Sequence, residues 1–315
     1  MTTKNQPLSG NELARFSGPN TFMRLPQATR FDGLDVAVVG VPMDIGTSWR
    51  SGTRFGPKQV RAESAMIRPY NMGTGAAPFG SLQVADVGDV AINTFSLSQS
   101  LAIIENIYKA ILEHNVIPMG IGGDHSITLP ILRAMADKHG PLALVHVDAH
   151  ADVNDDMFGE KETHGTVFRR AYEEGLIVPK KTFQIGIRGS GYAATDFTEA
   201  RGWGFRQYPA ETLWHKSLTA IGDEIRDEIG TTKTYVTYDI DNLDPAYAPG
   251  TGTPEIGGLT TLQALQLIRA LKGLNIVGCD LVEVSPPYDS SGNTALTGAN
   301  LLYELLCVLP GVESR

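Results

Sequence analysis

Residues 141–152 read PLALVHVDAHAD, and this stretch contains a strand and a chemical motif together. The first half is a near-continuous apolar run, which is typical of a strand buried on both faces of a parallel sheet. In the second half Asp148, His150 and Asp152 occupy alternate positions, so in an extended chain their side chains point to the same side. A solvated polar loop would explain them poorly, because buried carboxylates are costly unless they are paired or bind a metal. That alternative suits the following residues 154–156 better.

Similar apolar runs recur on both sides of this stretch and alternate with helical patterns. The other strand candidates are residues 34–42, 115–123, 182–189, 233–241 and 274–287. The helix candidates are residues 57–70, 97–113, 126–138, 211–229, 260–272 and 293–308, where apolar residues recur three and four positions apart. This alternation predicts an α/β fold with a mostly parallel sheet and helices on both faces.

The chain divides into an arm and one domain. Residues 1–33 are polar and broken by Pro and Gly, whereas no linker interrupts residues 34–315. Phe22, Met23 and Leu25 form an apolar patch within the arm. We expect this patch to dock, either onto its own domain or onto a neighbouring subunit.

Composition narrows the class of protein. The chain has 315 residues, 42% of them hydrophobic, and a formal net charge of −9, which disfavours binding to phosphate backbones. No apolar stretch is long enough to span a bilayer, and the first residues lack the build of a signal peptide. The two cysteines, Cys279 and Cys307, lie in apolar runs and read as buried thiols. We therefore expect a cytoplasmic protein that binds neither nucleic acid nor membrane.

Two more polar groups follow predicted strands. His125 lies in GGDHS (residues 122–126), and Asp239 and Asp241 lie in DIDNLDP (residues 239–245). Taken alone, a single turn histidine is more often structural, and acidic turns are common. However, ligands of open α/β sheets bind at the carboxyl edge, where all of these groups should meet. Together they offer His125, Asp148, His150, Asp152, Asp239 and Asp241.

Six such ligands exceed what a single catalytic ion needs. Carboxylates with a few imidazoles suit Mn²⁺ or a similar ion. Two ions about 3.5–4 Å apart can share carboxylates and lower the pKa of a water between them. The sequence thus predicts a binuclear manganese hydrolase.

The motifs GGDHS, DAHAD (residues 148–152) and DIDNLDP resemble the three signatures of the ureohydrolases, the arginase and agmatinase family. The similarity extends along almost the whole chain. The resemblance implies a three-layer α/β/α fold with a central eight-stranded sheet, two Mn²⁺ ions per subunit and a trimer or hexamer.

The resemblance also assigns roles to residues. It places one ion on His125, Asp148, Asp152 and Asp239, and the other on His150, Asp148, Asp239 and Asp241, so that Asp148 and Asp239 bridge. His164, in KETHGT, matches the proton-shuttle histidine of the family, although without the family it would read as the start of a helix. Glu283, in DLVEVSPP, matches the residue that holds the guanidinium, which a carboxylate can grip through paired hydrogen bonds. His146 reads as a packed residue behind Asp148.

Within the family the chain is most similar to the guanidinobutyrase branch, and Met157 occupies a position where that branch has Met. This implies hydrolysis of 4-guanidinobutanoate to urea and 4-aminobutanoate. Agmatinase and guanidinopropionase activities are the alternatives; a non-catalytic partner subunit or a deacetylase-like amide hydrolase is a more distant one. A site for a carboxylate tail should present a cation or backbone amides, and the candidate cations are Arg50, Lys161 and Arg188.

Overall fold

The computed structural model describes residues 4–314 and contains one eight-stranded sheet. All strand pairs are parallel, in the order β2-β1-β3-β8-β7-β4-β5-β6. The strands are β1 (Val36–Val41), β2 (Val84–Asp89), β3 (Ile117–Gly122), β4 (Leu142–Val147), β5 (Ile177–Ile185), β6 (Arg206–Tyr208), β7 (Lys233–Asp239) and β8 (Asn275–Val282).

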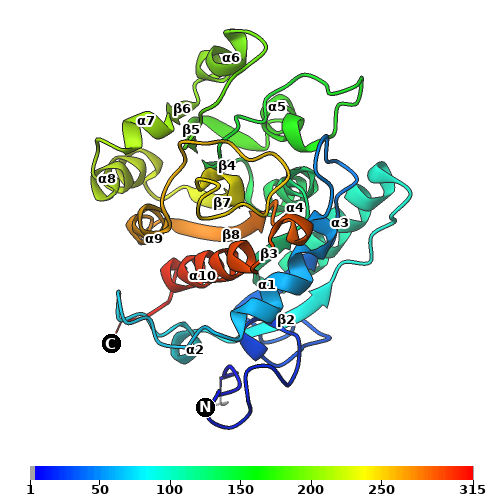
Figure 1. The fold of residues 1–315 in the computed structure, drawn as a ribbon, viewed down its shortest axis with the longest axis vertical. Helices are drawn as coiled ribbons and strands as arrows, with labels where there is room; N and C mark the ends of the chain where they lie inside the picture. The colour runs from blue at the N-terminus through cyan, green and yellow to red at the C-terminus, as the bar shows by residue number, and fades with distance from the viewer. Residues whose placement is uncertain (1–3, 315) are drawn as a thin grey trace.

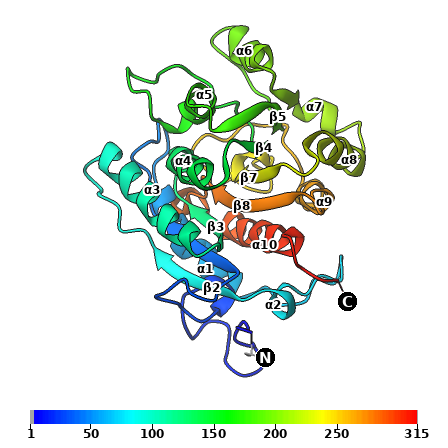
Figure 2. The same ribbon diagram turned by 180° about the vertical axis from the view of Figure 1, so that it is seen from behind.

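Helices cover both faces of this sheet (Figures 1 and 2). Residues of β1 alternate between two hydrophobic cores, with Val36 and Val38 in one and Ala37 and Val39 in the other. The first core includes α1, α8, α9 and α10, and the second includes α3, α4 and α5. The structure is therefore the three-layer α/β/α architecture that we expected.

The helices are η1 (Phe22–Arg24), η2 (Thr53–Phe55), α1 (Gly56–Ser64), α2 (Pro78–Ser81), α3 (Leu97–Glu113), η3 (His125–Ile127), α4 (Thr128–His139), η4 (His164–Thr166), α5 (Val167–Glu173), α6 (Thr195–Trp203), α7 (Ala210–Leu213), α8 (Leu218–Ile229), η5 (Ile240–Asn242), α9 (Thr261–Ala270), η6 (Pro286–Tyr288) and α10 (Asn293–Val308).

All six predicted strands are present, but the two edge strands, β2 and β6, were not anticipated. Their sequences, VADVGD and RQY, lack the apolar run of a central strand because one side of an edge strand has no neighbour. The predicted helix over residues 211–229 is two helices, α7 and α8, separated by residues 214–217.

The N-terminal arm packs against its own domain. Phe22, Met23 and Leu25 are buried in the core that also contains α1, and the backbone N–H of Phe22 donates to Asp86 at 2.7 Å. Arg24 is buried and donates to several backbone carbonyls of the arm, which holds the arm in a compact turn. Of the two docking alternatives, the structure shows contact with the chain's own domain.

The composition led to expectations about the cysteines and about membrane-spanning helices. Both Cys279 and Cys307 are buried free thiols. Across residues 4–314, none of the helices has the length and apolar character required to cross a membrane.

Candidate metal centre

Four adjacent strands bring the predicted site residues together. In the sheet the order β3-β8-β7-β4 places side by side segments that are far apart in the chain. His125 follows β3, Glu283 follows β8, Asp239 ends β7 and Asp148 follows β4. Because parallel strands share one carboxyl edge, these residues meet there.

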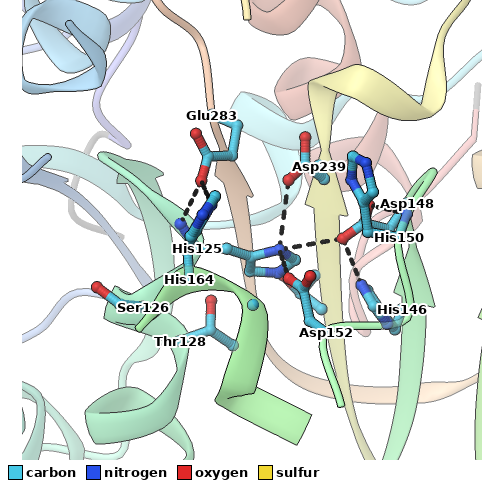
Figure 3. A network of polar contacts seen from close by, with 12 residues as sticks. His125, Ser126, Thr128, His146, Asp148, His150, Asp152, His164, Asp239 and Glu283 are labelled. Carbon is cyan, nitrogen blue, oxygen red and sulfur yellow. Dashed lines mark hydrogen bonds and ion pairs between the residues drawn. The ribbon is translucent and has the colours of Figure 1, made fainter. Parts of the chain in front are cut away.

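Three carboxylates surround His125 (Figure 3). Its Nδ1 atom lies 3.1 Å from an oxygen of Asp148, 3.1 Å from Asp152 and 3.3 Å from Asp239. His125 and Asp148 are fully buried. No hydrogen bond within residues 4–314 satisfies this Nδ1 atom, whose free lone pair would suit a cation. His125, Asp148 and Asp152 could therefore hold one ion, and their ligand atoms and one of His146 all lie within 4.8 Å of one another. Asp239 approaches His125 but is not part of this closest group.

A second group lies on the other side of Asp148. The Nδ1 atom of His150 is 3.0 Å from Asp241 and 3.5 Å from the second carboxylate oxygen of Asp148. Asp148, His150 and Asp241 have ligand atoms close enough to hold an ion together. Asp148 faces both groups with different oxygens, as a bridging ligand would. Asp239 approaches the first group only, and its other oxygen accepts the backbone N–H of Asp241 at 2.9 Å.

Residues behind the ligands fix their orientation. The Nε2 atom of His146 lies 2.7 Å from Asp148, and its Nδ1 atom lies 3.2 Å from the side-chain nitrogen of Gln184. Since an amide nitrogen only donates, His146 accepts at Nδ1 and donates its Nε2–H to Asp148. His146 is thus a support for Asp148 rather than a free ligand. On the far side of His125, Nε2 is 2.9 Å from the hydroxyl of Thr237.

The electrostatics of the cluster favour a cation. Burial raises the pKa of Asp239 well above its usual value, and the charges of Asp241 and Asp148 raise it further. Burial lowers the pKa of His125, but the adjacent carboxylates of Asp148, Asp152 and Asp239 outweigh burial and raise it. A cluster that attracts this much positive charge fits divalent ions, which would replace those protons.

Glu283 and His164 face the same space. Glu283 has a φ of 65° and is buried. One carboxylate oxygen accepts the backbone N–H of His125 at 2.9 Å and lies 3.4 Å from Nδ1 of His164. The other oxygen, Oε2, is buried and has no hydrogen-bond partner in the described chain. A buried, unpaired carboxylate oxygen is costly by itself, and it suits a cationic ligand such as a guanidinium.

His164 is the first residue of η4, so the alternative interpretation of this histidine as the start of a helix is correct. Its ring also points into the site (Figure 3). Its Nε2 atom is 2.7 Å from the hydroxyl of Ser48 and 3.2 Å from the Ser48 backbone nitrogen. Burial lowers the pKa of His164, but Glu283 outweighs this effect and raises the pKa to about 9. The Ser48 N–H needs a lone pair on the ring and so favours the neutral form. Nearby divalent ions would also favour neutral imidazole by repelling its positive charge.

The loop that carries Ser48 was missed by sequence reasoning. Asp124 is fully buried, and it accepts hydrogen bonds from the backbone of Gly46 and of Ser126. The Gly46 carbonyl in turn accepts the N–H of His164. The acidic residue beside His125 was one available signal. No pattern in the sequence connects residues 46–48 with the site, because the connection is made by folding.

A cavity opens beside the two groups, and Met157 lines it together with His150, Asp152, His164 and Asp239. The three cations considered for a substrate tail differ in their placement. Arg188 lines the cavity, but its guanidinium donates to backbone carbonyls that include those of Asp241, Asn242 and Glu255. It therefore joins loops and has few donors left. Lys161 is exposed and pairs with Asp155 at 3.3 Å, and Arg50 lies over the ring of Tyr288 at 5.3 Å. The structure thus gives no clear cationic partner for the tail among the three.

Comparison with known proteins identifies relatives along the whole chain. A family model described as "Arginase family" matches residues 34–307. The guanidinobutyrase of Pseudomonas aeruginosa is 63% identical over 314 residues, which are 99% of this chain and 98% of the relative. The mitochondrial agmatinase of Gallus gallus is 58% identical, over 98% of this chain and 91% of the relative. The solved structure of proclavaminate amidino hydrolase from Streptomyces clavuligerus has a TM-score of 0.89 at 41% identity, over 93% of this chain and 99% of that chain.

Proposed function

Because this chain belongs to the arginase family of ureohydrolases, we propose that it hydrolyses 4-guanidinobutanoate to urea and 4-aminobutanoate. One observation carries the proposal: the unpaired Oε2 of Glu283 lies beside a cluster of carboxylates and imidazoles that fits two divalent ions. In the reaction, water adds its oxygen to the guanidinium carbon. The bond from this carbon to the substituted nitrogen breaks, and that nitrogen leaves with a proton as the amine.

We propose that the six predicted ligands hold two ions, with Asp148 shared. Mn²⁺ is the metal that the family resemblance favours, and the donor set of oxygens and imidazoles suits it. Such a pair would supply a hydroxide nucleophile at neutral pH by lowering the pKa of water. One oxygen of Asp239 faces His125 and the other accepts the backbone N–H of Asp241, and a carboxylate oxygen that accepts one N–H keeps a second lone pair for an ion.

The residues of the chain then have distinct tasks. Glu283 binds the guanidinium and fixes the position of its central carbon. His164 lies 3.4 Å from Glu283, close enough to deliver a proton to the leaving nitrogen. Ser48 holds the ring in place through Nε2, which leaves Nδ1 facing Glu283.

The choice of substrate tail rests on similarity together with Met157. The relative with 63% identity is a guanidinobutyrase, whereas the relative with 58% identity is an agmatinase, so agmatine is the second candidate. Met157 is flexible and lines the cavity, where it leaves room for a longer tail. Assembly as a trimer or hexamer and a cytoplasmic location stay predictions of the sequence.

Replacing Met157 by Tyr should shift the preference toward 3-guanidinopropanoate. The Met157 sulfur packs so closely on residue 165 that a Cβ added to Gly165 would lie 2.7 Å from it, so a larger ring there has to enter the cavity. One methylene of pocket contact corresponds to about 1–3 kcal/mol. The measurement is the ratio of kcat/KM for 3-guanidinopropanoate and 4-guanidinobutanoate. An unchanged ratio would show that Met157 does not contact the tail.

The proposal is tested by the purified chain alone. Protein loaded with Mn²⁺ is given arginine, agmatine, 3-guanidinopropanoate and 4-guanidinobutanoate, and urea release is measured. We expect 4-guanidinobutanoate to have the highest kcat/KM. A higher value for agmatine would reassign the substrate within the family. No turnover of any guanidino compound would favour a non-catalytic partner subunit instead.

A further inference from the structure

The guanidinium partner Glu283 cannot offer both of its oxygens equally. Oε1 already accepts the N–H of His125 at 2.9 Å and lies 3.4 Å from Nδ1 of His164. A carboxylate oxygen has about two lone-pair sites, so Oε1 has little acceptor capacity left. Oε2 is free. A planar guanidinium presents several N–H donors and therefore needs a further acceptor near Oε2.

Gly252 marks the space where that acceptor lies. A Cβ atom built on Gly252 would lie 3.3 Å from the backbone carbonyl oxygen of Arg50 and 3.5 Å from Oε2 of Glu283. The next atom, a methyl of Thr47, is 4.0 Å away. Gly252 is buried, and these are the three atoms nearest to the point apart from its two chain neighbours. The Arg50 carbonyl oxygen and Oε2 of Glu283 therefore lie on the side of Gly252 toward which a Cβ would project.

No hydrogen bond from residues 4–314 reaches the Arg50 carbonyl. The neighbouring Gly52 N–H bonds to the buried Asp44 at 3.0 Å, and the Arg50 guanidinium lies over the Tyr288 ring. A carbonyl oxygen without a donor from the protein and an unpaired carboxylate oxygen that lie close to one point suit a ligand with several N–H donors.

We propose that Gly252 and the main-chain carbonyl of Arg50 complete the guanidinium site, with the substrate's N–H groups shared between this carbonyl and Oε2 of Glu283. The inference deepens the proposed function and rests on it. Gly252 is a specificity-determining residue because a side chain there would contact both oxygens and crowd a guanidinium that is bound to them. The conformation of the backbone does not require glycine, since φ lies outside the left-handed region.

The test is Gly252→Ala, which adds one methyl group at this point. The added Cβ requires the Arg50 carbonyl to move by a few tenths of an ångström, and the two other nearest atoms lie at ordinary contact distances. We therefore expect wild-type metal content and Tm. The matched control is Gly202→Ala, on the exposed surface of α6, where an added Cβ meets nothing within 4 Å.

Two measurements read out the site. In the first, kcat/KM is compared for 4-guanidinobutanoate, 3-guanidinopropanoate and agmatine, with the amine product measured. Gly252→Ala should lower all three by the same factor of about tenfold or more, the loss of one charge-assisted hydrogen bond. In the second, guanidinium chloride at low concentration is titrated calorimetrically into metal-loaded protein. Its Kd should rise by a similar factor in Gly252→Ala and stay unchanged in Gly202→Ala.

The outcomes separate this inference from the proposed function. If the wild type cleaves no guanidino compound, the proposed function fails, and the calorimetric comparison still decides the inference. Equal guanidinium Kd in wild type and Gly252→Ala, or no binding to the wild type, overturns the inference. Loss of activity toward one tail only would place Gly252 in the tail site and would also overturn it.

Discussion

At the residue scale the site depends on His125, which has a different partner on each ring nitrogen. Nδ1 faces the oxygens of Asp148, Asp152 and Asp239 at 3.1–3.3 Å, and Nε2 meets Thr237 at 2.9 Å. Hydrogen bonding at Nε2 fixes the ring, which leaves the Nδ1 lone pair free for a cation.

Asp239→Ala should lose far more activity than Asp155→Ala. Asp239 is buried and approaches His125, whereas Asp155 is exposed and pairs with Lys161 and Arg170. Removing a ligand lowers both metal occupancy and turnover, but removing a surface partner changes neither strongly. Metal content and kcat of the two variants are compared under saturating Mn²⁺. Equal losses would mean that the site lies elsewhere.

His164→Ala should lower kcat by about 10²–10⁴-fold while metal content stays the same. The ring lies beside Glu283 and Ser48, and within residues 4–314 it forms no hydrogen bond or ion pair with the carboxylates proposed as ligands. Steady-state kinetics and metal analysis of the same sample provide the check. Ser48→Ala gives a graded comparison, with a smaller loss, because the backbone N–H of Ser48 still reaches Nε2. If His164→Ala loses metal, His164 is a ligand rather than a proton carrier.

At the element scale, strands β3, β8, β7 and β4 act as one frame. Each ends at the same edge, and each delivers one polar group from a different part of the chain. Arg188 strengthens this edge, since its guanidinium donates to carbonyls of residues 241–243 and 255. The loops after β5 and β7 are therefore fixed relative to each other.

Thr237→Val should weaken metal binding without removing any ligand. Thr237 lies on β7 and meets Nε2 of His125, so valine leaves the ring without its support. Loss of such outer partners typically costs about 10–100-fold in metal affinity. Competition with a chelator measures the Kd for Mn²⁺. Thr234→Val is the matched control on the same strand, because Thr234 bonds to the Thr232 carbonyl, away from the site. A similar loss in both variants would indicate a general effect on β7.

At the scale of the whole molecule, the two proposed ions should stabilise the fold. The buried carboxylates Asp148, Asp239 and Asp241 repel one another unless cations lie between them. Ions that bind only the folded state add about 2.7 kcal/mol of stability at a free concentration of 100 times Kd.

Removal of metal by a chelator should therefore lower Tm by several degrees and abolish urea release, and Mn²⁺ should restore both. Calorimetry with and without Mn²⁺ measures the change. The Asp239→Ala protein is the control, since its Tm should respond much less to Mn²⁺. If the Tm of the wild type is the same with and without Mn²⁺, the proposal that these carboxylates bind ions is contradicted.

Much of this architecture was predictable from local patterns. The six central strands are apolar because both of their faces are buried, so their sequences reveal them. The ligand candidates were visible for the same reason, because polar side chains directly after such runs, as at Asp148 and Asp239, have no packing role. The sequence did not predict the edge strands β2 and β6 or the break between α7 and α8. Partial exposure of these segments weakens their hydrophobic pattern.

The sequence by itself determined the class of fold, the candidate metal-ligand motifs and the family, because these depend on short-range patterns of burial and spacing. Only the tertiary structure decided which atoms meet. In the folded structure the Arg188 guanidinium donates to backbone carbonyls, and His146 donates to the carboxylate of Asp148. Folding also brought the Arg50 carbonyl and Gly252 to the free oxygen of Glu283. Arg50 lies more than 200 residues before Gly252 and Glu283 in the chain. These contacts follow from the order of strands in the sheet, which no local pattern encodes.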